Sequence, residues 1–191
     1  MTEWQVTKEE VFPKRKNPLD NPFYGYRRLG VKLPDGRDAR YHGVVVPDCV
    51  HVVALEDDET TYLVRQSRPN AMPVGNTEIP RTWELPGGFD DLSDLAASAR
   101  KELEQEIGKR AATLLKIGVL LPSPGVSSEH DHIYLGSDLE DVSIADEVEA
   151  TEQDIEILSG KFGGLYHDMA RQQTPVSAQT LAAMAIVATL L

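Results

Sequence analysis

The pattern of apolar and polar positions predicts that the chain begins with β-strands. A loosely alternating segment is followed by Pro34-Asp35-Gly36, a turn sequence, and by a second alternating segment, which together predict a hairpin. Two further runs rich in β-branched residues flank Glu56-Asp57-Asp58-Glu59 and predict a second hairpin. With a short strand at the N-terminus, these strands are expected at residues 4–7, 24–33, 39–46, 50–55 and 61–66.

The clearest helix is predicted over residues 92–107, after a glycine turn at Gly87-Gly88. Ser93 or Asp91 is expected to cap its first turn, and Gly108 is a natural C-terminal stop. Apolar residues recur at a spacing near 3.6, which is typical of a helix that buries one face. They are Leu92, Leu95, Ala96, Ala99, Leu103 and Ile107.

The remaining elements indicate the fold class. The acidic segment 137–152 lacks apolar periodicity and is expected to be an exposed loop. Strands are predicted at 112–120, 132–135 and 155–158, and helices at 164–171 and 175–191. This order favours an α+β fold, an α/β/α sandwich with a mixed sheet, over a doubly wound parallel sheet. We expect a small N-terminal β subdomain, an arm with strands, at residues 1–40 and a main domain at residues 41–191.

Composition restricts the partners and the location of the chain. Its formal net charge of −12 argues against nucleic acid as a partner, because phosphate backbones need a cationic surface. The longest apolar run, 181–191, has about half the length needed to cross a bilayer, so no membrane association is expected. The polar, acidic start of the chain does not resemble a signal peptide. The single cysteine, Cys49, is expected to be buried and inert, and it fits a reducing cytoplasm.

Two carboxylates beside the glycine turn indicate chemistry. Glu102 and Glu106 are four residues apart, so on a helix they lie one turn apart on the same face. Such a pair repels itself unless a cation lies between the two charges, and Mg2+ is the usual guest for oxygen ligands. The alternative is a solvated acidic face, formed by Glu102, Glu104 and Glu106.

With these residues in view, segment 83–108 resembles the signature of the Nudix hydrolase superfamily, G-x5-E-x7-R-E-U-x-E-E-x-G-U, in which U is aliphatic. Residues 101–108, K-E-L-E-Q-E-I-G, match its second half at most positions. Flanking motifs are similar to those of the ADP-ribose pyrophosphatase-like branch and occur in the same order. They are Arg65-Gln66-Ser67-Arg68, Trp83-Glu84-Leu85-Pro86-Gly87-Gly88, Ser123-Pro124-Gly125 and Ala178-Gln179-Thr180.

The signature is degenerate at several positions. Taking Gly88 as its glycine leaves the following loop one residue short and places Asp94 at the acidic position. Lys101 replaces the arginine, and lysine cannot make the two-bond fork with a carboxylate that arginine makes. Gln105 replaces the first glutamate of the E-E pair and contributes no charge.

The resemblance implies a metal site and a substrate site. The metal, Mg2+ or Mn2+, would be held by Glu102, Glu106 and the carbonyl of Gly87, with Gln105 as a weak oxygen ligand. Glu102 and Glu106 would thus be catalytic, and relatives take a general base from a mobile loop after the signature. We expect the base to be Glu149 or Glu152. Substrate contacts are expected from Arg68, Arg65, Glu84, Gly88 and Glu129, although the two arginines could be plain surface charges and Glu129 an ordinary exposed acid.

The implied function is metal-dependent hydrolysis of a nucleoside diphosphate linked to another moiety. ADP-ribose, cleaved to AMP and ribose 5-phosphate, is the expected substrate. Two alternatives stay open: a catalytically impaired fold that binds a nucleotide as a sensor or regulatory module, and a hydrolase of a different nucleotide sugar. The resemblance also implies a homodimer, because in relatives the N-terminal region often swaps onto the partner subunit.

Overall fold

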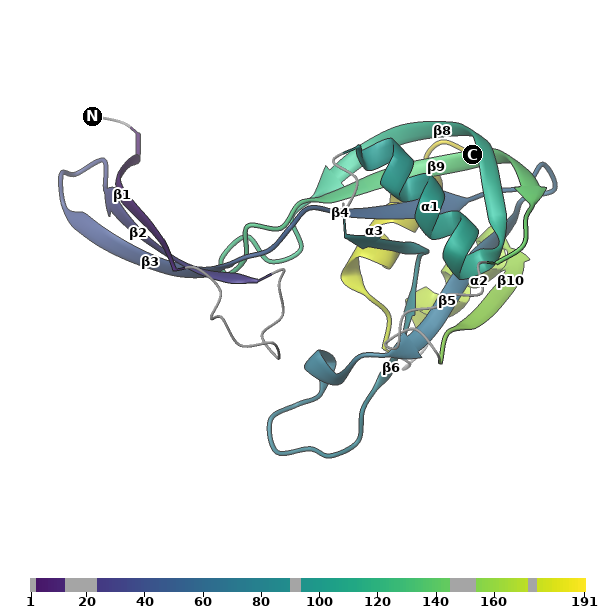
Figure 1. Cartoon of the computed structure of the whole chain (residues 1–191), viewed down its shortest axis with the longest axis horizontal. Helices are drawn as coiled ribbons and strands as arrows, with labels where there is room; N and C mark the ends of the chain where they lie inside the picture. The colour runs from purple at the N-terminus through teal and green to yellow at the C-terminus, as the bar shows by residue number, and fades with distance from the viewer. Residues whose placement is uncertain (1–2, 13–23, 90–93, 145–153, 172–174) are drawn as a thin grey trace. The chain divides into compact units, whose positions relative to one another are not determined.

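The structure is a computed structural model that describes residues 3–12, 24–89, 94–144, 154–171 and 175–191 (Figure 1). It divides into two compact units. The first comprises residues Met1–Asp48 and Leu121–His130, and the second comprises Cys49–Leu120 and Asp131–Leu191. In the described part of the chain, no helix is both long enough and apolar enough to span a membrane.

The first unit is built on a three-stranded antiparallel sheet. Its strands are β1 (Gln5–Phe12), β2 (Gly25–Lys32) and β3 (Asp38–Val45), in that order. The predicted hairpin is confirmed, because β2 pairs with β3 and Gly36 takes a positive φ of 87° in the turn between them. Residues 121–130 join β3 through a bridge between Val44 and Ser127.

The second unit contains a mixed four-stranded sheet, as predicted. Its order is β7 (Gly87–Phe89), β4 (Cys49–Ala54), β9 (Asp131–Asp141) and β8 (Lys109–Leu120). Strands β4 and β9 run parallel, whereas β7 and β8 are antiparallel to their neighbours. A second sheet consists of β10 (Glu156–Lys161), β5 (Thr60–Ser67) and β6 (Arg81–Glu84), with the 3-10 helix η1 (Pro69–Ala71) between β5 and β6.

Helices cover both faces of the sheets in the second unit. On one side, α1 (Leu95–Ile107) contributes Ala99, Leu103 and Ile107 to a hydrophobic cluster with alternate residues of β4 (Figure 1). On the other side, α2 (Phe162–Arg171) and α3 (Ala178–Val187) form a second cluster with Leu63, Leu85 and Ile133. The predicted α+β sandwich is therefore confirmed.

Three local predictions were wrong. Strands β4 and β5 do not form a regular hairpin, because they enter different sheets and their pairing is limited to an isolated bridge between Leu55 and Thr61. Helix α1 is capped by Asp94, not by Ser93 or Asp91, which lie outside the described residues, and it begins three residues later than expected. The segment expected to be a loop from residue 137 continues strand β9 as far as Asp141.

Candidate active site

Helix α1 is fixed at both ends by its own sequence. The Asp94 carboxylate accepts hydrogen bonds from the backbone N–H groups of Ala96 at 3.0 Å and Ala97 at 3.2 Å. These bonds satisfy donors that have no partner in the first helical turn. At the other end, Gly108 takes the left-handed conformation with φ 64° and ends the helix, as predicted. The aspartate at the acidic position of the signature thus has a structural role as a cap.

Glu102 and Glu106 lie on the buried side of α1. Their exposed fractions are 8% and 6%, which is unusual for glutamate. Glu104, between them, is partly exposed and receives a hydrogen bond of 2.7 Å from Arg110. Two of the three glutamates therefore face the protein, so the alternative of a solvated acidic face accounts only for Glu104.

The glycine turn lies directly against these two carboxylates. The backbone N–H of Gly87 donates to Oε2 of Glu106 at 2.9 Å. A Cβ at Gly88 would lie 2.7 Å from Oε1 of Glu102, and a Cβ at Gly87 would lie 2.2 Å from the carbonyl oxygen of Val50. Only glycine fits such approaches. Gly87, Gly88, Glu102 and Glu106 thus form one cluster, and Gln105 is half-buried on the same helix.

The two arginines that are predicted to bind the substrate phosphates each pair with a carboxylate. Arg68 donates to both oxygens of Glu84, from Nε at 2.8 Å and from Nη2 at 2.6 Å, in a two-bond fork. Arg65 lies 3.7 Å from Oε2 of Glu156, and its guanidinium stacks 5.4 Å from the centre of the Trp83 ring. Both side chains are therefore held in defined orientations, and their role toward phosphate stays a prediction.

Glu84 is a buried anion whose charge is compensated. Burial alone would raise the pKa of Glu84, but hydrogen bonds from Arg68 and Thr82, and the charges of Arg68 and His51, lower it below its usual value. A carboxyl whose pKa is lowered on folding stabilises the protein above the usual pKa of 4.5, and this contribution is lost as the pH falls through the folded value.

An Arg68→Met variant is expected to lose about 2 kcal/mol of unfolding free energy at pH 7, because a charged hydrogen-bonded partner is removed from a buried carboxylate. The difference between wild type and variant should shrink as the pH falls below 4.5, where Glu84 takes up a proton in both proteins. Urea unfolding of both proteins at pH 7 and pH 3.5 measures this difference in unfolding free energy. An equal difference at both pH values would contradict the assignment.

Two polar residues that were not predicted as site residues lie near Gly87: His51 lies against it, and Asp131 lies near His51. His51, on β4, has its Nδ1 only 2.8 Å from where a Cβ on Gly87 would lie. Its Nε2 lies 3.7 Å from Oδ1 of Asp131, whose side chain is fully buried. The available signal was weak: His51 is a single polar residue in the apolar strand β4, Asp131 only begins β9, and their proximity depends on the pairing of the two strands.

For three predicted residues, the described structure does not test a place at this cluster. Glu129 lies in the 121–130 segment of the first unit, where it is half-buried and its N–H donates to the Ser127 hydroxyl at 3.4 Å. Glu149 and Glu152, the expected general bases, lie outside the described residues. Their roles stay predictions.

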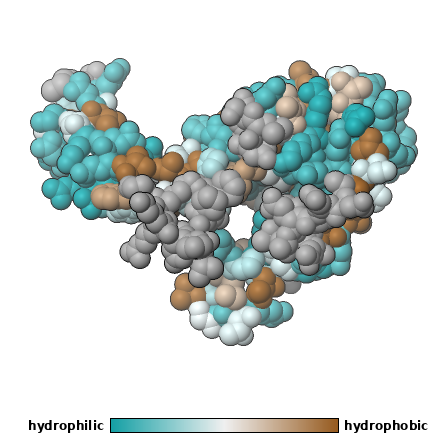
Figure 2. All heavy atoms as spheres, viewed as in Figure 1, coloured by the Kyte–Doolittle hydropathy of each residue, from teal (hydrophilic) through white to brown (hydrophobic). Residues whose placement is uncertain are grey.

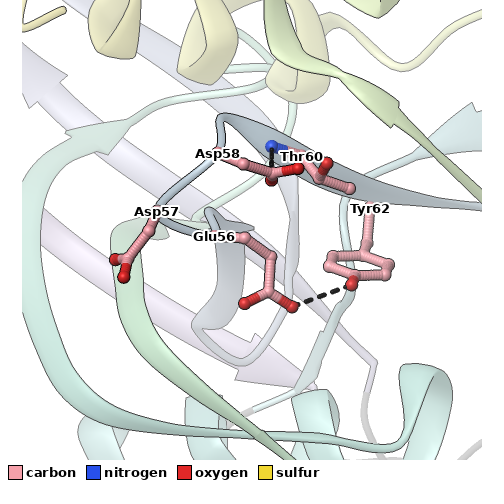
Figure 3. A pocket seen from close by; sticks show the side chains of 5 residues that line it. All are labelled: Glu56, Asp57, Asp58, Thr60 and Tyr62. Atoms are coloured by element: carbon pink, nitrogen blue, oxygen red, sulfur yellow. Dashed lines mark hydrogen bonds between the residues drawn. The ribbon is translucent and has the colours of Figure 1, made fainter.

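A separate pocket at the turn between β4 and β5 does not suit a diphosphate. Glu56, Asp57 and Asp58 line it together with Thr60 and Tyr62 (Figure 3), and carboxylates repel phosphate. Lys109 lies 2.8 Å from Glu56 and compensates part of this charge. Burial would lower the pKa of Lys109, but hydrogen bonds to Asp141, Glu56 and Tyr62 raise it. The pocket is therefore no candidate for the substrate phosphates.

Comparisons with known proteins show what the whole chain is similar to. No family model matches the chain. An ADP-ribose pyrophosphatase of Bacillus subtilis (strain 168) is 30% identical over 125 residues, which cover 65% of this chain and 62% of that protein. The resemblance to ADP-ribose pyrophosphatases is confirmed. A solved structure described as an ADP compounds hydrolase has a TM-score of 0.71 over 99% of this chain and 94% of its own, at 19% identity, and shares the Nudix fold.

A second curated relative of this chain is named for another kind of substrate. It is the CMP-5'-(N-acetyl-N-hydroxy-3-aminopropyl)phosphonate hydrolase of Streptomyces rubellomurinus (strain ATCC 31215), 30% identical over 123 residues, or 63% of this chain and 56% of that protein. The chain thus matches less than two thirds of the length of either curated relative. Similarity alone therefore does not select a substrate.

Proposed function

We propose that the protein hydrolyses a nucleoside diphosphate linked to another moiety, with ADP-ribose cleaved to AMP and ribose 5-phosphate. The observation that carries this proposal is the contact of Glu102 and Glu106, both buried, with the glycine turn at Gly87-Gly88. The reaction is proposed to occur in the cytoplasm, which the use of a single cysteine supports.

The cluster fits a hard divalent cation. The proposed donors are all oxygens: the two buried carboxylates one helical turn apart, the backbone carbonyl of Gly87 and the amide oxygen of Gln105. Oxygen donors are the ligands that a hard divalent cation such as Mg2+ prefers, which supports this proposal. When bound there, Mg2+ or Mn2+ would supply charge neutralisation for the diphosphate and a water molecule of lowered pKa.

The residues of the chain would position the substrate around this cluster. Glu84 binds Nε and Nη2, along one edge of the Arg68 guanidinium, and so fixes the direction of its charge. We assign to Arg68, and next to Arg65, the phosphate groups of the substrate, because guanidinium groups match phosphate oxygens. Gly88 allows the backbone to approach closely. Glu149 or Glu152 would accept the proton of the attacking water, and Glu129 is proposed as a further substrate contact.

The direct test is the release of AMP from ADP-ribose with Mg2+ and with Mn2+. The panel should also contain other nucleotide sugars and a cytidine monophosphate ester, because one relative is named for a CMP conjugate. Turnover of at least one compound, dependent on the metal, is the expected result. Tight calorimetric binding of ADP-ribose with no turnover of any compound would instead support a nucleotide-binding sensor.

We also propose that the first unit forms a homodimer interface and contacts substrate. Its sheet buries little, since Val31 is its only buried hydrophobic residue among those described, whereas many apolar side chains are exposed (Figure 2). These are Trp4, Val6, Val11, Phe12, Tyr24, Tyr26, Tyr41, Val44, Leu121 and Val126. A sheet with so much exposed apolar surface is typical of an interaction site.

Light scattering coupled to size exclusion is expected to give twice the chain mass of 21.1 kDa. A Val6→Lys, Val11→Lys double variant should shift the protein toward the monomer, because two cations would be buried in the interface. Val74→Lys is the matched control, since Val74 is an exposed valine too but belongs to the second unit. A monomeric wild type at micromolar concentration would contradict the proposal.

A further inference from the structure

The segment just before α3 is attached to the strand that leads into the glycine turn. Residues 175–177 lie beside Trp83 of β6, to which they are joined by a parallel bridge. The Trp83 N–H donates to the carbonyl of Pro175 at 3.1 Å, and the Ser177 N–H donates to the carbonyl of Trp83 at 3.1 Å. Since β6 leads directly into the glycine turn, this attachment ties the start of α3 to the approach to the candidate active site.

A buried hydroxyl extends the attachment to the turn itself. Oγ1 of Thr180, in the first turn of α3, accepts a hydrogen bond of 2.9 Å from the Leu85 N–H. Ser177, which caps α3, donates to the same Oγ1 at 2.8 Å. Thr180 and Leu85 are only 1% and 2% exposed, so bulk water does not reach this bond. Without Oγ1, the Leu85 N–H would be a buried donor with no acceptor, which is unfavourable.

Three successive residues of the turn are thus held by three different elements. Leu85 is held by α3. The Pro86 carbonyl accepts a hydrogen bond of 2.9 Å from the Val52 N–H of β4. The Gly87 N–H donates to Glu106 of α1 at 2.9 Å. The place of the next polar group along the backbone, the carbonyl of Gly87, therefore depends on α3 as well as on β4 and α1.

We infer that Thr180 is a positioning residue for the proposed metal site: through Leu85 it sets the place of the Gly87 carbonyl. The inference rests on the proposed function, in which that carbonyl is a metal ligand. Replacing a residue that orients a metal ligand commonly changes metal affinity by about 10- to 100-fold. This role also accounts for the motif Ala178-Gln179-Thr180, which no step of the proposed hydrolysis uses.

Two substitutions separate the hydrogen bond of Thr180 from its packing. Thr180→Val keeps the shape of the side chain and removes the acceptor, whereas Thr180→Ser keeps the hydroxyl and removes a buried methyl group. We expect Thr180→Val to weaken Mn2+ binding by about tenfold and Thr180→Ser to stay within about twofold of wild type. The electron paramagnetic resonance signal of free Mn2+, recorded during titration of the purified full-length chain, measures this affinity without substrate.

Val187→Ala is the matched control for a loss of packing. Val187 is fully buried in the same helix and belongs to the same hydrophobic cluster as Leu85, and its truncation leaves the Thr180 hydroxyl in place. This variant should lower the Tm, because it leaves a cavity in the core, and should keep Mn2+ affinity within about twofold of wild type. Amide hydrogen exchange of Leu85 in the metal-free protein should be faster in Thr180→Val than in Thr180→Ser.

AMP release from ADP-ribose separates a failure of this inference from a failure of the proposed function. In an active protein, Thr180→Val should raise the Mn2+ concentration for half-maximal rate about tenfold, with kcat at saturating Mn2+ within about threefold of wild type. A wild type that binds Mn2+ but releases no AMP would contradict the proposed hydrolysis. The tenfold difference in Mn2+ affinity would then still support the role of Thr180.

Two outcomes would overturn the inference. The first is an equal Mn2+ affinity of wild type and Thr180→Val. The second is a loss of affinity that is as large in Thr180→Ser or Val187→Ala as in Thr180→Val, since the affinity would then follow packing and not the hydrogen bond. Should Thr180→Val fail to fold, Thr180→Cys takes its place, because sulfur is only a weak acceptor. We expect it to weaken Mn2+ binding at least about threefold, and an unchanged affinity would again overturn the inference.

Discussion

Replacement of Glu106 by glutamine is expected to lower kcat for ADP-ribose hydrolysis by at least two orders of magnitude. The substitution preserves the shape of the side chain and leaves an oxygen that can accept the 2.9 Å hydrogen bond from the Gly87 N–H. It removes the negative charge that the proposed metal site requires, and charge is the main source of affinity for a hard cation. Initial rates of AMP release at several Mg2+ concentrations measure the effect.

Glu104→Gln is the matched control for this variant. Glu104 lies on the same helix, but its carboxylate pairs with Arg110 at the surface. We expect its activity to stay within about twofold of wild type, because exposed ion pairs contribute little. If the Glu106→Gln enzyme kept a tenth or more of wild-type activity in an otherwise active protein, Glu106 would not be a metal ligand.

Replacement of Gly87 by alanine is expected to reduce the free energy of unfolding by about 3 kcal/mol. The new methyl group would lie 2.2 Å from the carbonyl oxygen of Val50 and 3.0 Å from Cα of His51. Both are backbone atoms of β4, a strand paired on both sides, so relief of the clash must move β7 away from β4. Urea unfolding followed by circular dichroism measures the loss.

The control for this substitution is Gly164→Ala. Gly164 lies in α2, and a Cβ there would meet no atom within 4 Å. Alanine at this helical position should be neutral or stabilise by roughly 0.5–1 kcal/mol. A Gly87→Ala protein as stable as wild type would show that the close approach of β7 to β4 is not maintained in solution.

Local sequence signals were sufficient for much of the fold. The Pro34-Asp35-Gly36 turn, the apolar stripe of α1 and its stop at Gly108 depend on residues close together in the chain, so periodicity and turn chemistry identify them. Glu102 and Glu106 were found in the same way, because helical spacing alone puts them on one face. What the sequence could not show is that this face is buried against Gly87-Gly88.

The failures concern pairing between distant segments. Two strands around a short acidic turn normally pair, but the partners of β4 are β7 and β9, and those of β5 are β6 and β10. No pattern of residues in or between β4 and β5 distinguishes pairing with each other from pairing with these distant strands. The same limitation hid His51 and Asp131, which are 80 positions apart and meet only through the register of β4 with β9. The prediction of the residue that caps α1 was wrong because several acidic and hydroxyl residues near the start of the helix were equally suitable as caps.

The position of β4 between β7 and β9 has a consequence for how this chain tolerates insertions and deletions. Val50, Val52 and Ala54 point into the cluster of α1, whereas Val53 points into that of α2 and α3, on the face that also carries Cys49 and His51. A slip of one residue in the register of β4 would exchange the two sets of side chains between the faces of the sheet. It would bury the imidazole of His51 among the leucines of α1. We therefore expect insertions and deletions to be tolerated far less well within the six residues of β4 than in the turn around Gly75, whose residues are exposed.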